Sequence, residues 1–322
     1  MLTRTIRLAG HATVVALSLA ALAAPATAAS WPSGKIEMII PSSPGGGFDT
    51  YARVLGKAMG DELHINVVPK NISGGAGMRG ARAAFNARPD GQTFAIFNVP
   101  GIIQPIIAGK NPGYDMDKID WLGAMAFNQY IIVVKKDSPY KTLADLKKSG
   151  KTVTFTGYGS SGLAANRVFC SVVGLKCQII TGYPGNNDAL LAVVRGDAIA
   201  SVTPITTATS FNAGGDLKGL LLMTDRDVAA FPHTQKATDA GYPSLASLGL
   251  IRAFGLPAGV KPDVRKAFAE AFKKAMNSEQ VKAWAKKSRS PLDPMNGQEL
   301  AKLIKSQTQL LMKYKDVITK QK

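Results

Sequence analysis

The stretch from Pro41 to Arg53, PSSPGGGFDTYAR, carries residue types that could bind an anion. It follows a short apolar run, Ile36 to Ile40, that predicts a buried strand, and apolar residues recur with helical spacing from Asp49 onward. Three glycines let the main chain approach a guest closely, and the first N–H groups of a helix have no internal partner. The helix dipole would favour a negative charge there. The simpler alternative is a tight turn in which Asp49 only caps the helix.

A second glycine turn, Gly157 to Gly162, lies in a similar setting between a predicted strand and a predicted helix. Its glycines have the G-x-G-x-x-G spacing of dinucleotide-binding loops. We exclude a dinucleotide site, because the next strand ends in Ile179-Ile180-Thr181 without the Asp or Glu that would hold a ribose. The motif therefore predicts a second helix N-terminus, which exposes N–H groups and serine hydroxyls.

Neither loop contains a side chain suited to catalysis. The stretches 41–48 and 154–165 lack His, Cys, Lys and Arg, and there is no G-x-S-x-G nucleophile motif in them. We therefore predict a binding protein, not an enzyme, and no cofactor. A bound anion would be held by main-chain amides, hydroxyl groups and water, with no salt bridge required.

Cysteine and histidine usage gives no metal site. Beyond the N-terminal segment, the only histidines are His64 and His233, and neither has a metal-ligand spacing. Cys170 falls late in a predicted helix and Cys177 at the start of the next strand, so a local disulfide is sterically allowed in an oxidising compartment. The sequence leaves open whether the two thiols are joined.

The N-terminal segment has the pattern of a secretory signal peptide over residues 1–28. Arg4 and Arg7 precede an uncharged segment, 12–24, and a small-residue cleavage site, Ala26-Thr27-Ala28. We therefore expect a periplasmic protein. Of the 39 basic and 22 acidic residues, two arginines belong to this segment, so the remainder has a net charge of 37 − 22 = +15. The lysines are spread over predicted helices without a nucleic-acid motif, and we expect no nucleic-acid partner.

The elements that position these loops form two similar units. Each unit reads strand, helix, strand, helix, strand, which predicts an α/β fold with parallel strands. The first has strands at 36–40, 65–68 and 93–97 and helices at 49–60 and 75–87; the second has strands at 151–155, 177–180 and 198–202 and helices at 163–173 and 186–195. Further strands are predicted at 130–134, 217–224 and 251–256. Ligands collect beyond the carboxyl ends of parallel strands, so loops 41–48 and 98–104 should border a crevice.

Several motifs occur in an order that resembles the extracytoplasmic solute receptors of the tripartite tricarboxylate transporter family, also called Bug proteins. They are PSSPGGGFDTYAR (41–53), GGAGMRGA (74–81), RPDG (88–91), GYGSSG (157–162), GYPG (182–185) and ATDAGYP (237–243). The resemblance implies a two-lobed periplasmic binding protein of type II, a Venus flytrap, in which each lobe is a mostly parallel sheet flanked by helices. It implies lobe 1 at 30–127 plus 226–322 and lobe 2 at 128–225.

The resemblance also implies a function. A receptor of this kind, here expected to be a monomer, closes over a small carboxylate and delivers it to membrane permease subunits. The positions that correspond to the family's binding loops, together with weaker candidates deeper in the crevice, are Pro44, Gly45, Gly46, Gly47, Phe48, Asp49, Asn98, Tyr158, Gly159, Ser160, Ser161, Gly162, Asn166, Tyr183, Asn187, Thr203 and Thr206. We expect the amides of 46–48 to take one carboxylate, and Ser160 and Ser161 to take the other or a polar tail.

This sequence departs from the family pattern at three positions. Ser42 stands where many relatives carry Phe or Tyr, Asn166 where a His is frequent, and Thr203 where an Asp is frequent. Such an Asp can hold a ligand ammonium, so its absence argues against an amino-acid ligand and favours an unsubstituted mono- or dicarboxylate. Phe48, Tyr158 and Tyr183 could also flank an aromatic ring.

Three alternative functions stay open from the sequence: an enzyme, a sensory receptor and an anion-binding scaffold that does not close, which would be equally compact with and without ligand. An exported α/β enzyme that acts on an acidic substrate would show turnover, whereas a receptor binds one ligand and releases it unchanged. A sensory receptor of the same fold would dock onto a signalling protein instead of a permease.

Overall fold

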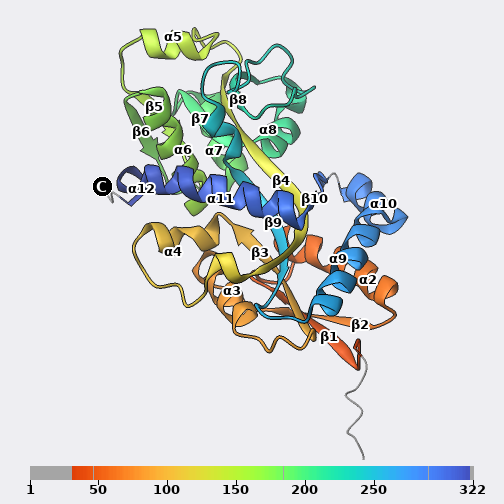
Figure 1. Ribbon diagram of the computed structural model, residues 1–322. Helices are drawn as coiled ribbons and strands as arrows, with labels where there is room; N and C mark the ends of the chain where they lie inside the picture. The colour runs from red at the N-terminus through yellow and green to blue at the C-terminus, as the bar shows by residue number, and fades with distance from the viewer. Residues whose placement is uncertain (1–30, 46, 184, 289, 320–322) are drawn as a thin grey trace, which may run out of the picture.

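The computed structural model describes residues 31–319 except 46, 184 and 289, so the predicted signal peptide lies outside the described residues. Figure 1 shows two lobes, one above the other, which share the long strand β4 (Asp120–Lys135). Eight strands form one continuous hydrogen-bonded path in the order β2-β1-β3-β9-β4-β7-β5-β6, two further strands, β8 and β10, pair with β4, and helices lie on both faces. The predicted α/β class and the two lobes are confirmed.

The first βαβαβ unit forms the sheet of the lower lobe. Strand β1 (Lys35–Ile40) pairs in parallel with β2 (Asn66–Asn71) and β3 (Thr93–Val99). The helices between them are α2 (Gly47–Leu63) and α3 (Met78–Phe85). The second helix begins later than predicted, because Gly75 and Gly77 have positive φ and form the short 3-10 turn η2 (Gly75–Gly77).

The second unit forms the upper lobe. Strand β5 (Val153–Thr156) pairs in parallel with β6 (Cys177–Ile180) and with β7 (Ala200–Pro204). Helix α6 (Gly159–Val173) follows β5, α7 (Asn186–Arg195) follows β6, and α8 (Ile205–Phe211) follows β7. Glycines in the left-handed conformation, Gly174 and Gly196, end α6 and α7.

The sheet is mixed, because β4 and β9 (Gly249–Leu256) run antiparallel to their neighbours. Strand β9 lies between β3 and the first part of β4, while the second part of β4 pairs with β7 and with β8 (Leu217–Met223). β4 is much longer than the predicted strand 130–134. Its first part was missed because small and polar residues interrupt the apolar pattern, and the register shifts twice between Trp121 and Ala126.

The remaining elements cover the lobes or connect them. They are η3 (Gly101–Ile103), α4 (Gln104–Ile107), η4 (Met116–Lys118), α5 (Leu143–Lys148), η5 (Asn212–Gly214), η6 (Pro243–Ser247), α9 (Pro262–Asn277), α10 (Glu279–Ser288), β10 (Met295–Asn296), α11 (Gly297–Lys313) and α12 (Lys315–Thr319). No helix within the described ranges combines the length and the apolar character needed to cross a bilayer.

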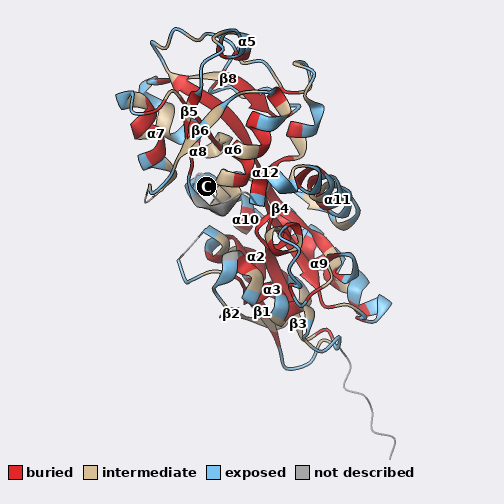
Figure 2. Ribbon diagram, turned by 90° about the vertical axis from the view of Figure 1, so that its left-hand side faces the viewer, coloured by how far each residue is buried: buried red, intermediate tan, exposed pale blue. Residues whose placement is uncertain are grey.

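The C-terminal helices α9 and α11 each bury one apolar face. Phe268 and Phe272 of α9 and Leu300 and Leu311 of α11 are buried. Helix α9 packs against α2 and β4, and α11 packs against β4. Each such side chain contributes about 1.5–3 kcal/mol by leaving water. In Figure 2 the buried residues follow the strands through both lobes.

The end of the chain returns to the upper lobe. The guanidinium of Arg167 on α6 donates a hydrogen bond to the carbonyl oxygen of Ile318 on α12. The segment after β8 also stays with this lobe, because the Ala237 N–H donates to the carbonyl oxygen of Leu222. Two segments that follow residue 225 in the sequence, the one after β8 and helix α12, therefore also contact the upper lobe.

Candidate functional site

In both lobes the parallel strands run towards the junction between the lobes, so their C-terminal ends lie at that junction. Strand β9 is antiparallel to both β3 and β4, so β1, β3 and the first part of β4 all run in one direction, towards the upper lobe. Strand β7 is antiparallel to β4, and β5 is parallel to β7, so β5 and β7 run towards the lower lobe. The loops that follow β1, β3, β5 and β7 therefore approach the junction from opposite sides.

The register of the strands that pair with β4 gives the distance between the strand ends of the two lobes. Near the end of β3, Asn98 lies opposite Arg252 of β9, which lies opposite Ala126 of β4. Near the end of β7, Thr203 lies opposite Ile131 of β4. Five residues of strand separate Ala126 from Ile131, which corresponds to roughly 16 Å. The two edges are thus separated by a span that a small ligand and the side chains around it could bridge.

Asp49 organises the first glycine loop. Its carboxylate accepts hydrogen bonds from the backbone N–H of Gly45, the Nε of Arg53 and the Nδ2 of Asn71, each at 2.8 Å. The Asn71 amide also donates to the carbonyl oxygen of Ser42 at 2.8 Å. Asp49 is 3% exposed while the side chain of its partner Arg53 is 45% exposed, so these bonds are partly buried. They tie both ends of the loop to the first turn of α2.

The same contacts set the charge of the loop. The hydrogen bond from Arg53, opposed by burial and assisted by Asn71 and Gly45, lowers the pKa of Asp49 to about 2. Asp49 is therefore ionised at neutral pH and paired with Arg53 at 2.8 Å. Because its charge is neutralised locally, it does not oppose an anion at the helix N-terminus as strongly as an unpaired carboxylate would.

The other predicted residues of the lower lobe lie around this loop. Pro44, Gly45 and Gly47 are exposed and Phe48 is half-buried, whereas Gly46 lies outside the described residues. Asn98 is half-buried near the end of β3. The short turn η2 (Gly75–Gly77) comes close to Asn98, since a Cβ placed on Gly77 would lie 3.2 Å from the Cβ of Asn98 and 3.5 Å from that of Pro41.

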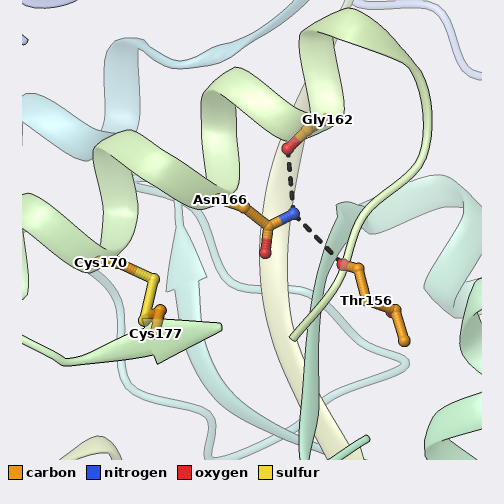
Figure 3. Close-up of a disulfide and its surroundings, with 5 residues drawn as sticks. All are labelled: Thr156, Gly162, Asn166, Cys170 and Cys177. Carbon is orange, nitrogen blue, oxygen red and sulfur yellow. Dashed lines mark hydrogen bonds between the residues drawn. A yellow bond between two sulfur atoms is a disulfide. The ribbon is translucent and has the colours of Figure 1, made fainter. Parts of the chain in front are cut away.

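In the upper lobe, Asn166 ties the glycine turn to the end of β5. Its Nδ2 donates to the carbonyl oxygens of Thr156, at 3.3 Å, and Gly162, at 3.0 Å (Figure 3). These bonds fix residues on both sides of the turn. Helix α6 accordingly begins at Gly159, four residues before the predicted start at 163, and Gly159, Ser160, Ser161 and Gly162 form its first turn behind the exposed Tyr158.

Several polar atoms at these edges are buried without a hydrogen-bond partner among the described residues. In the upper lobe they are Thr156 Oγ1, Asn166 Oδ1 and Thr203 Oγ1; in the lower lobe they include Ser42 Oγ and Gln104 Nε2. Leaving such groups unpaired costs about 1–3 kcal/mol each, so buried polar atoms are normally satisfied by protein, water or ligand. Their position at the strand ends marks both edges as places where a polar guest or water can bind.

The remaining predicted residues follow β6 and β7 on the upper lobe. Tyr183 is half-buried in the loop after β6, Asn187 is exposed in the first turn of α7, and Thr206 is half-buried in α8. Cys170 and Cys177 are joined by a disulfide between α6 and β6, beyond Asn166 from the glycine turn (Figure 3).

Arg252 is a residue of this region that the sequence reasoning missed. Its guanidinium carbon lies 4.1 Å from the centroid of the Tyr51 ring and 5.4 Å from that of Phe48, at the start of α2. Arg252 is only 8% exposed, and its Nε and Nη1 are buried without a hydrogen-bond partner in the part of the chain that the structure describes. Burial lowers the pKa of Arg252, although an arginine stays protonated at neutral pH.

A basic side chain therefore lies beside the first loop, contrary to the expectation that amides and hydroxyls alone would line it. A signal was present in the sequence. Arg252 is the one charged residue in the apolar strand 249–256, and a charge in a buried strand needs an explanation.

A separate groove of about 990 Å³ lies between α9, β4 and the start of α11. Its lining combines Trp121, Phe272 and Met276 with charged residues such as Arg265 and Glu270. None of the predicted binding residues lines it, so the groove is distinct from the two carboxyl edges.

Comparison with known proteins identifies relatives of the chain. The profile of the family described as "Tripartite tricarboxylate transporter family receptor" matches residues 51–322. Protein BugT of Bordetella pertussis is 24% identical over 285 residues, which cover 86% of this chain and 87% of BugT.

Solved structures share the fold. A TctC solute binding protein from Polaromonas, solved without ligand, superposes with a TM-score of 0.80 at 19% identity, covering 91% of this chain and all of that one. Two Rhodopseudomonas palustris proteins, MatC with bound malate and another with adipate, superpose with TM-scores of 0.64 and 0.66 at 18% and 19% identity. Both superpositions cover 89% of this chain; they cover 100% of the MatC chain and 98% of the chain solved with adipate. At these identities the likeness shows the two-lobed fold of periplasmic binding proteins.

Proposed function

Because the chain belongs to the tripartite tricarboxylate transporter receptor family, which consists of solute-binding receptors and not of enzymes, we propose that it captures a small organic carboxylate between its lobes and delivers it to a membrane permease. One observation carries the proposal. The N-termini of α2 and α6 follow β1 and β5, whose carboxyl ends point at the junction from opposite sides. Two helix N-termini supply oriented N–H groups and partial positive charge for an anion.

Each lobe contributes a distinct part of the binding site. In the lower lobe, the amides of Gly47 and Phe48 take one carboxylate, and Asp49 holds the loop in shape. In the upper lobe, Ser160, Ser161 and the amides at the start of α6 take the second carboxylate or a polar tail. Asn98, Tyr183, Asn187, Thr203 and Thr206 contribute contacts between these ends.

A mono- or dicarboxylate is the ligand class that these features favour. The R. palustris neighbours are described with malate and with adipate, which are both dicarboxylates. Thr203 cannot pair with an ammonium group as an aspartate would, which disfavours amino acids. Phe48 and Tyr183 are half-buried aromatic residues that would flank the ring of an aromatic carboxylate, a variant of the same ligand class.

We keep the predicted lobes, 30–127 plus 226–322 and 128–225, with the segment after β8 and helix α12 also in contact with the upper lobe. Closure would occur by bending where the chain passes between the lobes. The point at which β4 changes partners, from β9 up to Gln129 to β7 and β8 from Tyr130, is suited to such a hinge. A closed form would present a surface from both lobes to the permease. The predicted signal peptide and the periplasmic location of family members support the proposal that this exchange occurs in the periplasm.

A thermal-shift screen of the chain without residues 1–28 tests the function. A ligand that binds only the folded state raises the melting temperature by mass action, by an amount equivalent to about 2.7 kcal/mol at 100 times the dissociation constant. We expect aliphatic or aromatic carboxylates to raise it and neutral sugars to leave it unchanged. A response to sugars or amino acids alone would refute the ligand class, and conversion of the added compound to a product would favour an enzyme.

A further inference from the structure

Arg252 is a buried cation whose surroundings supply no counter-charge. The nearby loop carboxylate, Asp49, is already bonded to Arg53, Asn71 and the Gly45 amide. No ion pair within the described ranges includes Arg252, and two of its three nitrogens are buried without a hydrogen-bond partner. An uncompensated buried charge destabilises a fold, so its presence calls for a partner that binds from outside.

The guanidinium lies beside the N-terminus of α2. Its Nη2 is 3.5 Å from the position that a Cβ on Gly47 would occupy, so the absence of a side chain at Gly47 leaves that nitrogen next to the first turn. The N-terminus of this 17-residue helix carries a partial positive charge. Two positive groups side by side repel each other, and an anion between them would stabilise both.

Aromatic packing holds the guanidinium in place without neutralising it. The Tyr51 ring, 4.1 Å from the guanidinium carbon, is itself fixed by a 2.8 Å hydrogen bond from its hydroxyl to the carbonyl oxygen of Pro291 and by an edge contact with Trp284. A cation stacked on a fixed ring is oriented before any ligand arrives. Arg252 thus has the rigidity that a carboxylate-binding arginine requires.

From this arrangement, and on the basis of the proposed function, we infer that Arg252 pairs with a carboxylate group of the ligand at the N-terminus of α2. The two ends of the ligand then lie in unlike surroundings. Its charged carboxylate lies in the lower lobe between Arg252 and the amides of Gly47 and Phe48. Its other end meets the start of α6, where residues 154–165 contain no Lys or Arg, so that end can be a second carboxylate or a neutral polar group.

Titration calorimetry with adipate and monomethyl adipate tests this inference on the chain without residues 1–28. For the parent protein, we expect both compounds to bind, because each retains the carboxylate that Arg252 needs. In Arg252→Met, which keeps the length of the side chain without its charge, we expect the affinity for both to fall by at least about 30-fold. Arg252→Lys keeps the charge but not the planar fork, and should lose about five- to tenfold.

Two comparisons separate a binding role from a packing role. Arg265→Met is the matched control, because Arg265 is a half-exposed arginine on α9 paired with Asp120 at 3.1 Å, and its loss should leave the affinity unchanged. The ligand-free melting temperature is the second readout. If Arg252 only packs on Tyr51, Arg252→Met melts at a lower temperature and binds adipate as the parent does.

Affinity within threefold of the parent in both Arg252 variants would overturn the inference and leave the proposed function standing. A parent protein that binds neither compound nor any other carboxylate would overturn both. If Arg252→Met does not fold, Arg252→Lys and Arg252→Gln carry the test, and undiminished binding in Arg252→Gln would overturn the inference.

Discussion

The Nδ2 of Asn71 at the end of β2 lies 2.8 Å from the Oδ1 of Asp49 in the first turn of α2. This bond connects two parallel strands and a helix at one point, because the same amide also holds the Ser42 carbonyl after β1. The conformation of the glycine loop therefore depends on a residue outside the loop, Asn71 of β2, as well as on the loop's own sequence.

The first prediction concerns acid stability. The pKa of Asp49 is about 2 in the folded protein and 3.8 as its ordinary value, so ionised Asp49 stabilises the fold above pH 4 and this stabilisation is lost as the pH falls towards 2. The difference corresponds to about 2 kcal/mol, reduced by the partial exposure of Arg53. Asp49→Asn should lower the unfolding free energy at pH 7 and flatten its fall between pH 4 and 2. Urea titrations would measure both, with Asp61→Asn, in an exposed pair with Lys57, as the control.

The second prediction concerns the space between Gly47 and the guanidinium of Arg252. This residue has an ordinary φ, and a Cβ would meet only Arg252 Nη2 at 3.5 Å, so the fold should tolerate a side chain there. Gly47→Val should nevertheless reduce carboxylate affinity by at least about tenfold, because its methyl groups would fill the approach to the guanidinium and the helix amides. Calorimetry on Gly47→Ala and Gly47→Val should show a graded loss. Full affinity in the valine variant would mean that no ligand group reaches this place.

The third prediction concerns Asn166. Replacing it by Ala removes the bonds to the carbonyl oxygens of Thr156 and Gly162, in a residue that is fully buried. We expect a loss of about 1–3 kcal/mol in unfolding free energy and weaker ligand binding, because the turn before α6 loses its anchor. Thermal melts and calorimetry measure the two effects. Asn277→Ala, whose exposed amide bonds to the Lys273 carbonyl within α9, is the control and should change neither by much.

The fourth prediction concerns the disulfide. Cys170 and Cys177 are seven residues apart, so their bond closes a short loop and should contribute about 2 kcal/mol. The double variant Cys170→Ala/Cys177→Ala should melt a few degrees lower, and a reducing agent should lower the melting temperature of the parent protein but not of the variant. Carboxylate affinity should persist, because Asn166 still ties the turn to β5. A large loss of affinity in a folded double variant would contradict this division of roles.

The sequence predicted best those elements whose ends carry a distinct signal. Helix α7 has its predicted bounds, 186–195, because Gly185 precedes it and the left-handed Gly196 ends it. The start of α6 was placed too late, since Gly, Ser, Ser and Gly have the composition of a loop, and the bonds from Asn166 are not visible in the sequence pattern. Tertiary contacts decided the outcome there.

The glycine loops could be predicted from the sequence, whereas Arg252, which lies beside the first loop, could not. The glycine loops lie next to their own strands and helices, so a local pattern could predict them. Arg252 comes from β9, about 200 residues after the loop it adjoins, and reaches that loop only because β9 inserts between β3 and β4. The partners of such a residue depend on sheet order, which hydrophobic periodicity does not encode.

The claim that one ligand is held from both lobes can be measured by hydrogen exchange. Amide exchange would be followed by mass spectrometry in the chain without residues 1–28, with and without a carboxylate that raises the melting temperature. The account predicts slower exchange on binding in peptides that cover both 44–53 and 157–166, and little change in α9 or α5. Protection confined to one of these two stretches, or absent from both, would contradict it.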